Sequence, residues 1–250
     1  MNQRGYYPFS NTAVVTKNLI IINMLFWLAT MIMTKLDLTN MLGLHYPASK
    51  GFRLHQIVTY MFMHGSFAHL FFNMFAVFMF GRFLESIWGS KRFFTYYMVT
   101  GIGAGLINIL VAYLRIKSAE ANLSPDIIDE IYRDGYGIIQ QRMNYTDPLR
   151  GQLNLLINAT TVGASGAVFG ILLAFGMLLP NMPLYIIPFP FPIKAKYMVI
   201  GYGVVELFAG IANFSFDNVA HFAHLGGMLF GIILVLYWRK KDRNHEQYFF

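Results

Sequence analysis

The chain has 250 residues and a formal net charge of +7, but only 12% of its residues are charged while 56% are apolar. About a quarter of the residues of a soluble domain are charged, so the composition excludes an ordinary globular protein and predicts a membrane protein. The chain contains no cysteine, which excludes disulfides, thiolate catalysis and cysteine metal sites.

Six apolar segments approach the length of about 20 residues that a spanning helix needs. In chain order, the expected spans are 19–34, 57–84, 93–114, 155–179, 197–214 and 219–238. Together they use roughly 120 residues, so no sizeable soluble domain remains. We therefore expect residues 1–250 to form a single all-α membrane domain, a polytopic bundle of six transmembrane helices. The first span is expected to be a retained anchor rather than a cleaved signal peptide.

The basic residues predict how these spans are oriented. An even number of spans places both termini on one side of the membrane, and the short loops there hold most of the Lys and Arg. On the other side, five of eight basic residues lie in one long loop, 115–153. Because long loops count little toward orientation, we expect both termini in the cytoplasm of a bacterium, with the domain in the inner membrane. The positive charge then requires no nucleic acid partner, and the expected contacts are membrane lipids and membrane proteins.

Two stretches outside the spans have a pattern of their own. Five prolines between 180 and 192 exclude a helix interior, so 180–194 is expected to be an apolar loop. In the long loop, Ser124 and Pro125 are typical of an N-cap and first helical position. Apolar residues then follow at helical spacing: Ile127, Ile128, Ile131 and Tyr132. This pattern predicts either an amphipathic helix at the outer membrane surface or a soluble helical excursion without lipid contact.

The second expected span contains several polar side chains, which are functional candidates because they are unfavourable in lipid. His69 and Asn73 are four residues apart and share a helix face, whereas His64 lies on another face. These groups suit a metal site, hydrogen bonding to an oxyanion, or contacts between helices. Glu85 lies about 24 Å further along the helix, near the cytoplasmic end, where we expect it to accept hydrogen bonds from a loop or helix end.

The fourth expected span begins with polar residues, 158–161, followed by Ser165 in the motif Gly-Ala-Ser-Gly. A serine flanked by glycine is usually a packing position. Here the polar run indicates that the helix begins inside the membrane, after a non-helical stretch that is buried or lines a water-filled cavity. Ser165 is expected roughly 10 Å below the outer surface.

In the sixth expected span, His224, Gly227 and Gly231 are spaced by three and four residues and form one helix face. Glycines on such a face let another backbone approach closely. If the partner is Ser165, the two side chains make a nucleophile and its general base. Such a pair needs no acid, because a packed aromatic ring can orient the imidazole instead.

Together, the second, fourth and sixth spans resemble the rhomboid family of intramembrane serine proteases. The similarity covers 64–85, 163–170 and 221–231, in the order that the family has them. By this resemblance Ser165 is the nucleophile and His224 the general base. His69, Asn73 and the backbone N–H of Ser165 then line the oxyanion hole.

The resemblance also implies supporting roles. It makes His64 a structural histidine near the outer loop and Glu85 a structural carboxylate. Phe169 matches an aromatic residue, often Tyr, that stacks on the catalytic histidine, and Gly227 and Gly231 match close-packing glycines. The sequence departs from the family pattern at 55–56, where His-Gln stands in place of the frequent Trp-Arg, and in its longer loop at 115–153.

The resemblance implies a serine endopeptidase that cleaves peptide bonds in or near the transmembrane segments of membrane proteins. A Ser–His dyad does the chemistry, without a cofactor or metal. The fifth span and the loop 214–218 are expected to act as gate and lid. The alternative within the family is an inactive rhomboid-like protein that binds transmembrane helices without cutting them.

A zinc site and a transporter are two further interpretations, and fewer sequence features support them. A zinc site would use the histidines with Glu85, but no His-Glu-x-x-His motif is present and Glu85 lies at the wrong depth. A transporter is supported mainly by Glu206 in the fifth span, yet no inverted repeat is visible. We therefore expect Glu206→Gln to leave measurable proteolytic activity.

Overall fold

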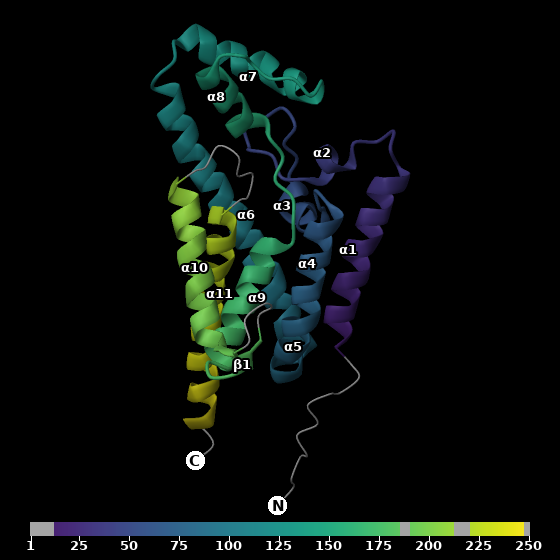
Figure 1. Cartoon of the computed structure of the whole chain (residues 1–250), viewed down its shortest axis with the longest axis vertical. Helices are drawn as coiled ribbons and strands as arrows, with labels where there is room; N and C mark the ends of the chain where they lie inside the picture. The colour runs from purple at the N-terminus through teal and green to yellow at the C-terminus, as the bar shows by residue number, and fades with distance from the viewer. Residues whose placement is uncertain (1–12, 186–190, 213–220, 248–250) are drawn as a thin grey trace, which may run out of the picture.

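The computed structural model describes residues 13–185, 191–212 and 221–247. Nearly all of its regular structure is helical (Figure 1). The α-helices are α1 (Val14–Ile32), α2 (Leu38–Leu42), α3 (Gln56–Thr59), α4 (Phe67–Ala76), α5 (Arg82–Trp88), α6 (Ser90–Glu120), α7 (Pro125–Gln140), α8 (Pro148–Asn158), α9 (Ser165–Leu178), α10 (Ala195–Ala212) and α11 (His221–Gln247). The short helical turns η1 (Tyr60–Phe62) and η2 (Val77–Gly81) precede α4 and α5, and β1 (Pro183–Leu184) pairs antiparallel with β2 (Ile193–Lys194).

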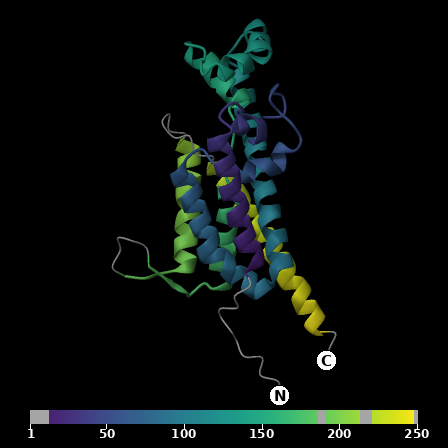
Figure 2. The same ribbon diagram turned by 90° about the vertical axis from the view of Figure 1, so that its right-hand side faces the viewer.

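The predicted all-α bundle of six helices is confirmed in outline. Within the described residues, five helical segments are long and apolar enough to cross a membrane: Val14–Ile32, Phe67–Trp88, Ser90–Glu120, Ala195–Ala212 and His221–Arg243. The sixth, α9, is apolar but shorter. The first described helix begins, and the last ends, on the same side of the bundle (Figures 1 and 2), as an even number of spans requires.

The second and fourth expected spans begin later than predicted. Residues 63–66 are not helical, and α4 starts at Phe67 because Ser66 caps it, its side chain accepting a hydrogen bond from the His69 N–H at 3.1 Å. The segment from 155 belongs partly to α8, which ends at Asn158. An extended stretch then precedes α9, and it pairs with the outer loop through reciprocal backbone hydrogen bonds of 2.8 Å between Leu44 and Thr161. The helix therefore begins at Ser165, inside the bundle, as the polar run indicated.

The other boundaries shift less. α1 starts five residues before the expected 19–34, and α6 extends the third span, 93–114, at both ends. The prolines at 180 and 183 lie outside helices, as expected for the loop 180–194. The end of the fifth expected span and the start of the sixth fall at 213–220, outside the described residues.

Three helices, α6, α9 and α11, pack against one another at the centre of the bundle. Small residues allow this close approach, since a Cβ placed on Gly166 would overlap Ala104 and one on Gly226 would meet Ile107 at 2.7 Å. The Tyr96 hydroxyl donates a 2.8 Å hydrogen bond to the Gly170 carbonyl, which fixes α6 against α9. The start of α9 is thus held between two long helices.

Beyond the bundle, on the side opposite the start of α1 and the end of α11, α7 and α8 form a separate layer (Figures 1 and 2). The apolar face predicted for α7 packs against α8 and the end of α6, in a cluster whose buried members are Ile116, Ile131, Leu153 and Ile157. Of the two interpretations left open, the structure therefore favours the helical excursion, because protein covers the apolar face.

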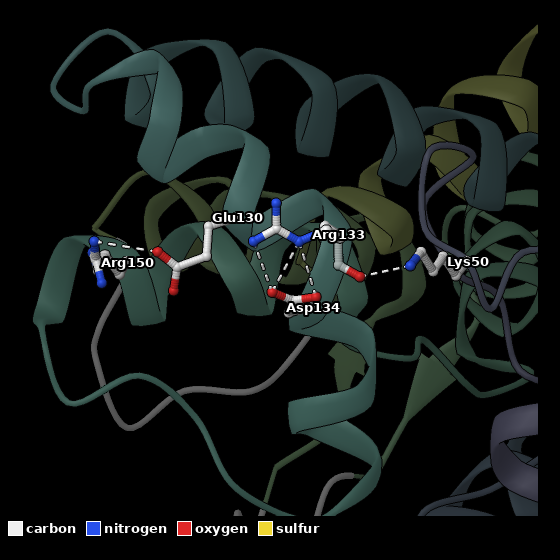
Figure 3. Close-up of polar contacts among 5 residues, drawn as sticks. All are labelled: Lys50, Glu130, Arg133, Asp134 and Arg150. Carbon is white, nitrogen blue, oxygen red and sulfur yellow. Dashed lines mark hydrogen bonds and ion pairs between the residues drawn. The ribbon is translucent and has the colours of Figure 1, made fainter.

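Polar contacts join α7 to α8 and to the outer loop between α1 and α4 (Figure 3). The Lys50 ammonium donates a 2.6 Å hydrogen bond to the Arg133 carbonyl, and Arg150 of α8 pairs with Glu130 of α7 at 3.5 Å. Nε2 of His45 lies 2.9 Å from Oδ1 of Asn40 and 3.1 Å from the hydroxyl oxygen of Thr160. Burial lowers the pKa of His45, so the ring is neutral near pH 7. This network links the outer loop to the segment that leads into Ser165.

Glu85 organises the other end of the bundle. Its carboxylate accepts hydrogen bonds from the N–H groups of Val15 (3.0 Å) and Thr16 (2.9 Å), from the Thr16 hydroxyl (2.8 Å) and from the Ser90 hydroxyl (2.6 Å). It therefore satisfies free N–H groups at the start of α1 and fastens the start of α6. It lies far along the helix from His69, as the sequence predicts.

We expect Glu85→Gln to lower the free energy of unfolding by about 1–3 kcal/mol, because the amide loses acceptors and turns an NH₂ group toward donors. Thermal unfolding in detergent measures the change. The matched control is Glu130→Gln, which removes a half-exposed ion pair and should change stability by less than about 1 kcal/mol. Equal losses in the two variants would contradict this role of Glu85.

Candidate active site

Ser165 and His224 come together from two helices that are far apart in the sequence. Ser165 is the first residue of α9, and its Oγ lies 2.8 Å from Nε2 of His224 in the first turn of α11. This is hydrogen-bonding distance, the separation that a nucleophile and its general base require. His224 is buried, whereas Ser165 is half-buried.

An aromatic ring fixes the plane of the imidazole. Phe169, one helical turn after Ser165, stacks on the His224 ring with centroids 4.2 Å apart and planes inclined by 7°. Tyr202 of α10 packs edge-on against Phe169, with ring centroids 6.1 Å apart. The stacking that the resemblance implies for Phe169 is present, without a hydroxyl group.

The N-terminus of α9 supplies free donors beside the serine. The N–H groups of the first turn of a helix have no acceptor within it, and they carry positive partial charge. Gly163 lies two residues before Ser165 and has a φ of +132°, and its N–H donates to the Tyr60 carbonyl at 2.9 Å. Only glycine adopts this backbone conformation readily. The arrangement suits a negative charge developing next to Ser165 Oγ.

His69 lies at this site, and Asn73 lies one turn further along α4. A Cβ placed on Gly163 would be 2.7 Å from Cε1 of His69 and 3.6 Å from Oγ of Ser165, so the two side chains flank the same glycine. The Asn73 amide donates to the carbonyl of His69 at 3.0 Å and is thus engaged within its own helix. His64 packs edge-on against His69, with ring centroids 5.0 Å apart.

Glycines bring the helices that carry Ser165 and His224 into backbone contact. A Cβ placed on Gly227 would overlap the Gly166 carbonyl, and one on Gly231 would overlap the Tyr96 hydroxyl. The Gly166 carbonyl belongs to the residue after Ser165. The separation of α9 and α11, and with it the Ser165–His224 distance, therefore depends on Gly227 having no side chain.

We expect Gly227→Ala to lower the free energy of unfolding by about 1–3 kcal/mol, because a backbone carbonyl cannot move aside as a flexible side chain can. The measurement is thermal unfolding in detergent. Gly201→Ala is the matched control, since a Cβ there meets nothing within 4 Å and helical Ala is favoured over Gly by up to about 1 kcal/mol. The prediction is wrong if Gly227→Ala is as stable as this control.

The structure also brings in one residue that the sequence did not assign to the site. Oε2 of Glu206, on α10, lies 2.7 Å from Nδ1 of His221 and 2.9 Å from Nδ1 of His224. From the sequence, Glu206 supports only a transporter. The Ser165–His224 pair is assigned no acid there, because a packed ring can orient the imidazole. The signal that could have identified it is its charge, since an acid in an apolar span usually has a function or a partner.

The structure describes the departure from the family pattern at 55–56 but not the expected lid. At the departure from the family pattern, Gln56 is buried and holds the outer loop, donating to the carbonyls of Met41 and Gly51 and accepting from the N–H of Arg53. The expected lid, 214–218, lies outside the described residues.

Comparison with known proteins agrees with this geometry. The family model of the rhomboid domain matches residues 51–241, more than half of the chain. Rhomboid-like protein 11, chloroplastic, of Arabidopsis thaliana is 27% identical over 193 residues, which cover 72% of this chain and 51% of that protein. Rhomboid protein 1, mitochondrial, of Saccharomyces cerevisiae is 26% identical over 186 residues, which cover 74% of this chain and 42% of that protein.

The chain thus spans about half the length, or less, of the curated relatives that it matches. The matched region contains every residue from His64 to Gly231 that the sequence singled out. With its apolar spanning helices, the chain is an integral membrane protein that belongs to the rhomboid family.

Proposed function

We propose that the protein is an active intramembrane serine endopeptidase, which hydrolyses peptide bonds in or near the transmembrane segments of other membrane proteins. The observation that carries this proposal is the 2.8 Å contact between Ser165 Oγ and His224 Nε2 beneath the Phe169 ring. A serine that only packs against a helix requires neither a histidine at this distance nor a stacked ring behind that histidine.

The chemistry follows from this pair. Ser165 Oγ attacks the carbonyl carbon of the substrate while its proton passes to His224 Nε2. The N–H of Ser165, with His69 and Asn73 as the further donors, stabilises the oxyanion. His224 then gives the proton to the leaving amine as the C–N bond breaks, and water hydrolyses the acyl-enzyme in the same way. Each step needs only this chain and water, so no cofactor or metal takes part in the proposal.

Substrates of this class reach the site from within the membrane. α4 exposes a row of large apolar side chains spaced by four residues, Phe67, Phe71 and Phe75. α10 also exposes apolar residues along its length, among them Ile200, Val204 and Ile211. These surfaces fit lipid or an apolar segment of a partner. In keeping with the family, we propose that α10 acts as the gate.

The chain is proposed to be one membrane domain with both termini in the cytoplasm, in a bacterial inner membrane. The bias of basic residues toward the short loops on the side of the termini supports this orientation. The printed names of the two relatives place those proteins in the chloroplast and the mitochondrion. Reporter fusions at each terminus and in the 115–153 loop test the orientation, and an active cytoplasmic reporter in that loop would contradict it.

The alternative is an inactive rhomboid-like protein that binds transmembrane helices without cleaving them. The two are separated by reconstituting the purified protein in liposomes with a panel of single-span substrates. An active protease yields two fragments from at least one substrate, at a bond in or near its transmembrane segment. Stable association without fragments from any substrate would favour the alternative.

A further inference from the structure

Nε2 of His224 faces Ser165, so the second ring nitrogen, Nδ1, faces another part of the protein. A neutral imidazole donates from one nitrogen and accepts at the other. If Nε2 is to take the proton of Ser165, the hydrogen must lie on Nδ1. This N–H is inside the bundle, where the His224 side chain is only 9% exposed. It therefore needs an acceptor, and the identity of the acceptor decides which way the ring is turned.

The stacked ring cannot make that choice alone. Rotating the imidazole by 180° about its bond to Cβ keeps the ring in the same plane, so stacking on Phe169 is preserved. The rotation exchanges Nδ1 with Cδ2 and Nε2 with Cε1, and a carbon then faces Ser165. Stacking fixes the plane of the ring, whereas only a polar partner at Nδ1 distinguishes the two orientations.

Glu206 is that partner among the described residues. Its Oε2 lies 2.9 Å from Nδ1 of His224, and the Glu206 side chain is only 11% exposed. The direction of the Nδ1–H bond deviates too far for the contact to qualify as a hydrogen bond, whereas the 2.7 Å contact with His221 does qualify. Contacts of this kind often tighten only when substrate is bound. We regard the short distance between two buried groups as the decisive feature.

A metal ion is the competing interpretation, because Glu206, His221 and His224 offer three ligand atoms within 4.8 Å of one another. The distances of 2.7 and 2.9 Å from one carboxylate oxygen to two nitrogens lie in the range of hydrogen-bond lengths. Ligands around a tetrahedral zinc ion are held about 3.3 Å apart. The spacing therefore fits two imidazole donors that share one acceptor better than it fits a ligand set.

We propose that Glu206 is a positioning residue for His224, so that the dyad works as a Ser165–His224–Glu206 arrangement spread over α9, α11 and α10. This inference rests on the proposed protease function. When the proton moves from Ser165 Oγ to Nε2, the hydrogen on Nδ1 stays in place. The negative carboxylate of Glu206 then stabilises the new positive charge of the ring. Because Glu206 belongs to α10, the base is oriented only while this helix is docked on α11.

The test compares Glu206→Gln with wild type in liposomes containing a cleavable single-span substrate. We expect kcat to fall about 10- to 100-fold, the size of loss seen when the carboxylate partner that orients a metal-ligating histidine is removed. KM should change little, because the proposed role of Glu206 is exerted through His224. Glu206→Asp retains the charge and should recover part of kcat. It also serves as the second variant if Glu206→Gln does not fold.

Two controls separate positioning from a structural role. Glu120→Gln removes a carboxylate bound to Lys117 and Tyr132 at the far end of α6 and should keep the wild-type kcat. His221→Ala removes the other partner of Glu206 and should lower kcat less than Glu206→Gln does. If Glu206 only anchored His221, the two losses would be equal, and the proposal would be overturned.

The remaining outcomes are also decisive. A wild-type kcat in folded Glu206→Gln would overturn the inference while leaving the protease function intact. Activity that is lost on chelation and restored by zinc would overturn it in favour of a metal site. If the wild-type protein cleaves no substrate and its Ser165 resists serine-directed reagents, the proposed function itself fails, which is a different result from either.

Discussion

Replacing Ser165 with alanine is expected to abolish cleavage of every substrate that the wild-type protein cuts. The substitution removes only the oxygen that lies 2.8 Å from His224, so the fold should be retained. Loss of the nucleophile from such a pair lowers kcat by roughly 10⁴- to 10⁶-fold. Fragment formation in proteoliposomes, with thermal unfolding of the same preparation, provides the measurement.

The matched control is Ser118→Ala, at an exposed position near the outer end of α6. It should cleave at the wild-type rate. Cleavage by Ser165→Ala within about tenfold of wild type would mean that another group is the nucleophile, and the site would have to be reassigned.

His224→Ala is expected to have an effect of similar size. Without a base, the Ser165 hydroxyl is a weak nucleophile, and the leaving amine has no proton donor. Residues that act as a unit are not additive, so the Ser165→Ala/His224→Ala double variant should be no slower than either single variant. Rates are again measured on the reconstituted protein.

His55→Ala provides the comparison for His224→Ala, because His55 is exposed in the outer loop and contacts the Met41 carbonyl at 3.1 Å. Its activity should be close to that of wild type. If the losses from Ser165→Ala and His224→Ala multiplied in the double variant, the two residues would be acting independently, and the dyad would be excluded.

Much of the site could be predicted because its signals are local. The polar run before Ser165 indicated a helix that begins inside the membrane after a non-helical stretch, and α9 does begin at Ser165. The spacing of His224, Gly227 and Gly231 predicted one face in close contact with another backbone, and Gly227 lies against Gly166. Patterns within one helix are visible in the sequence because helix geometry is nearly constant.

What could not be predicted depends on how separate helices are rotated against each other. Glu206 is one acid in an apolar segment, and only the packing of α10 on α11 turns it toward the two histidines. The apolar face of α7 was visible, but whether lipid or protein covers it depends on where α8 lies. Likewise, α4 begins only at Phe67 because Ser66 caps it, whereas the apolar residues on both sides of 64–66 made the segment resemble one long span.

The protease assignment requires above all that Ser165 be an activated nucleophile in the folded protein. Labelling with a serine-directed phosphonate measures this directly and needs no knowledge of the natural substrate. We expect one covalent adduct on wild-type protein, located at Ser165 by peptide mass, with no adduct on Ser165→Ala and very slow labelling of His224→Ala. An unlabelled wild-type protein, or equal labelling of wild type and Ser165→Ala, would contradict it.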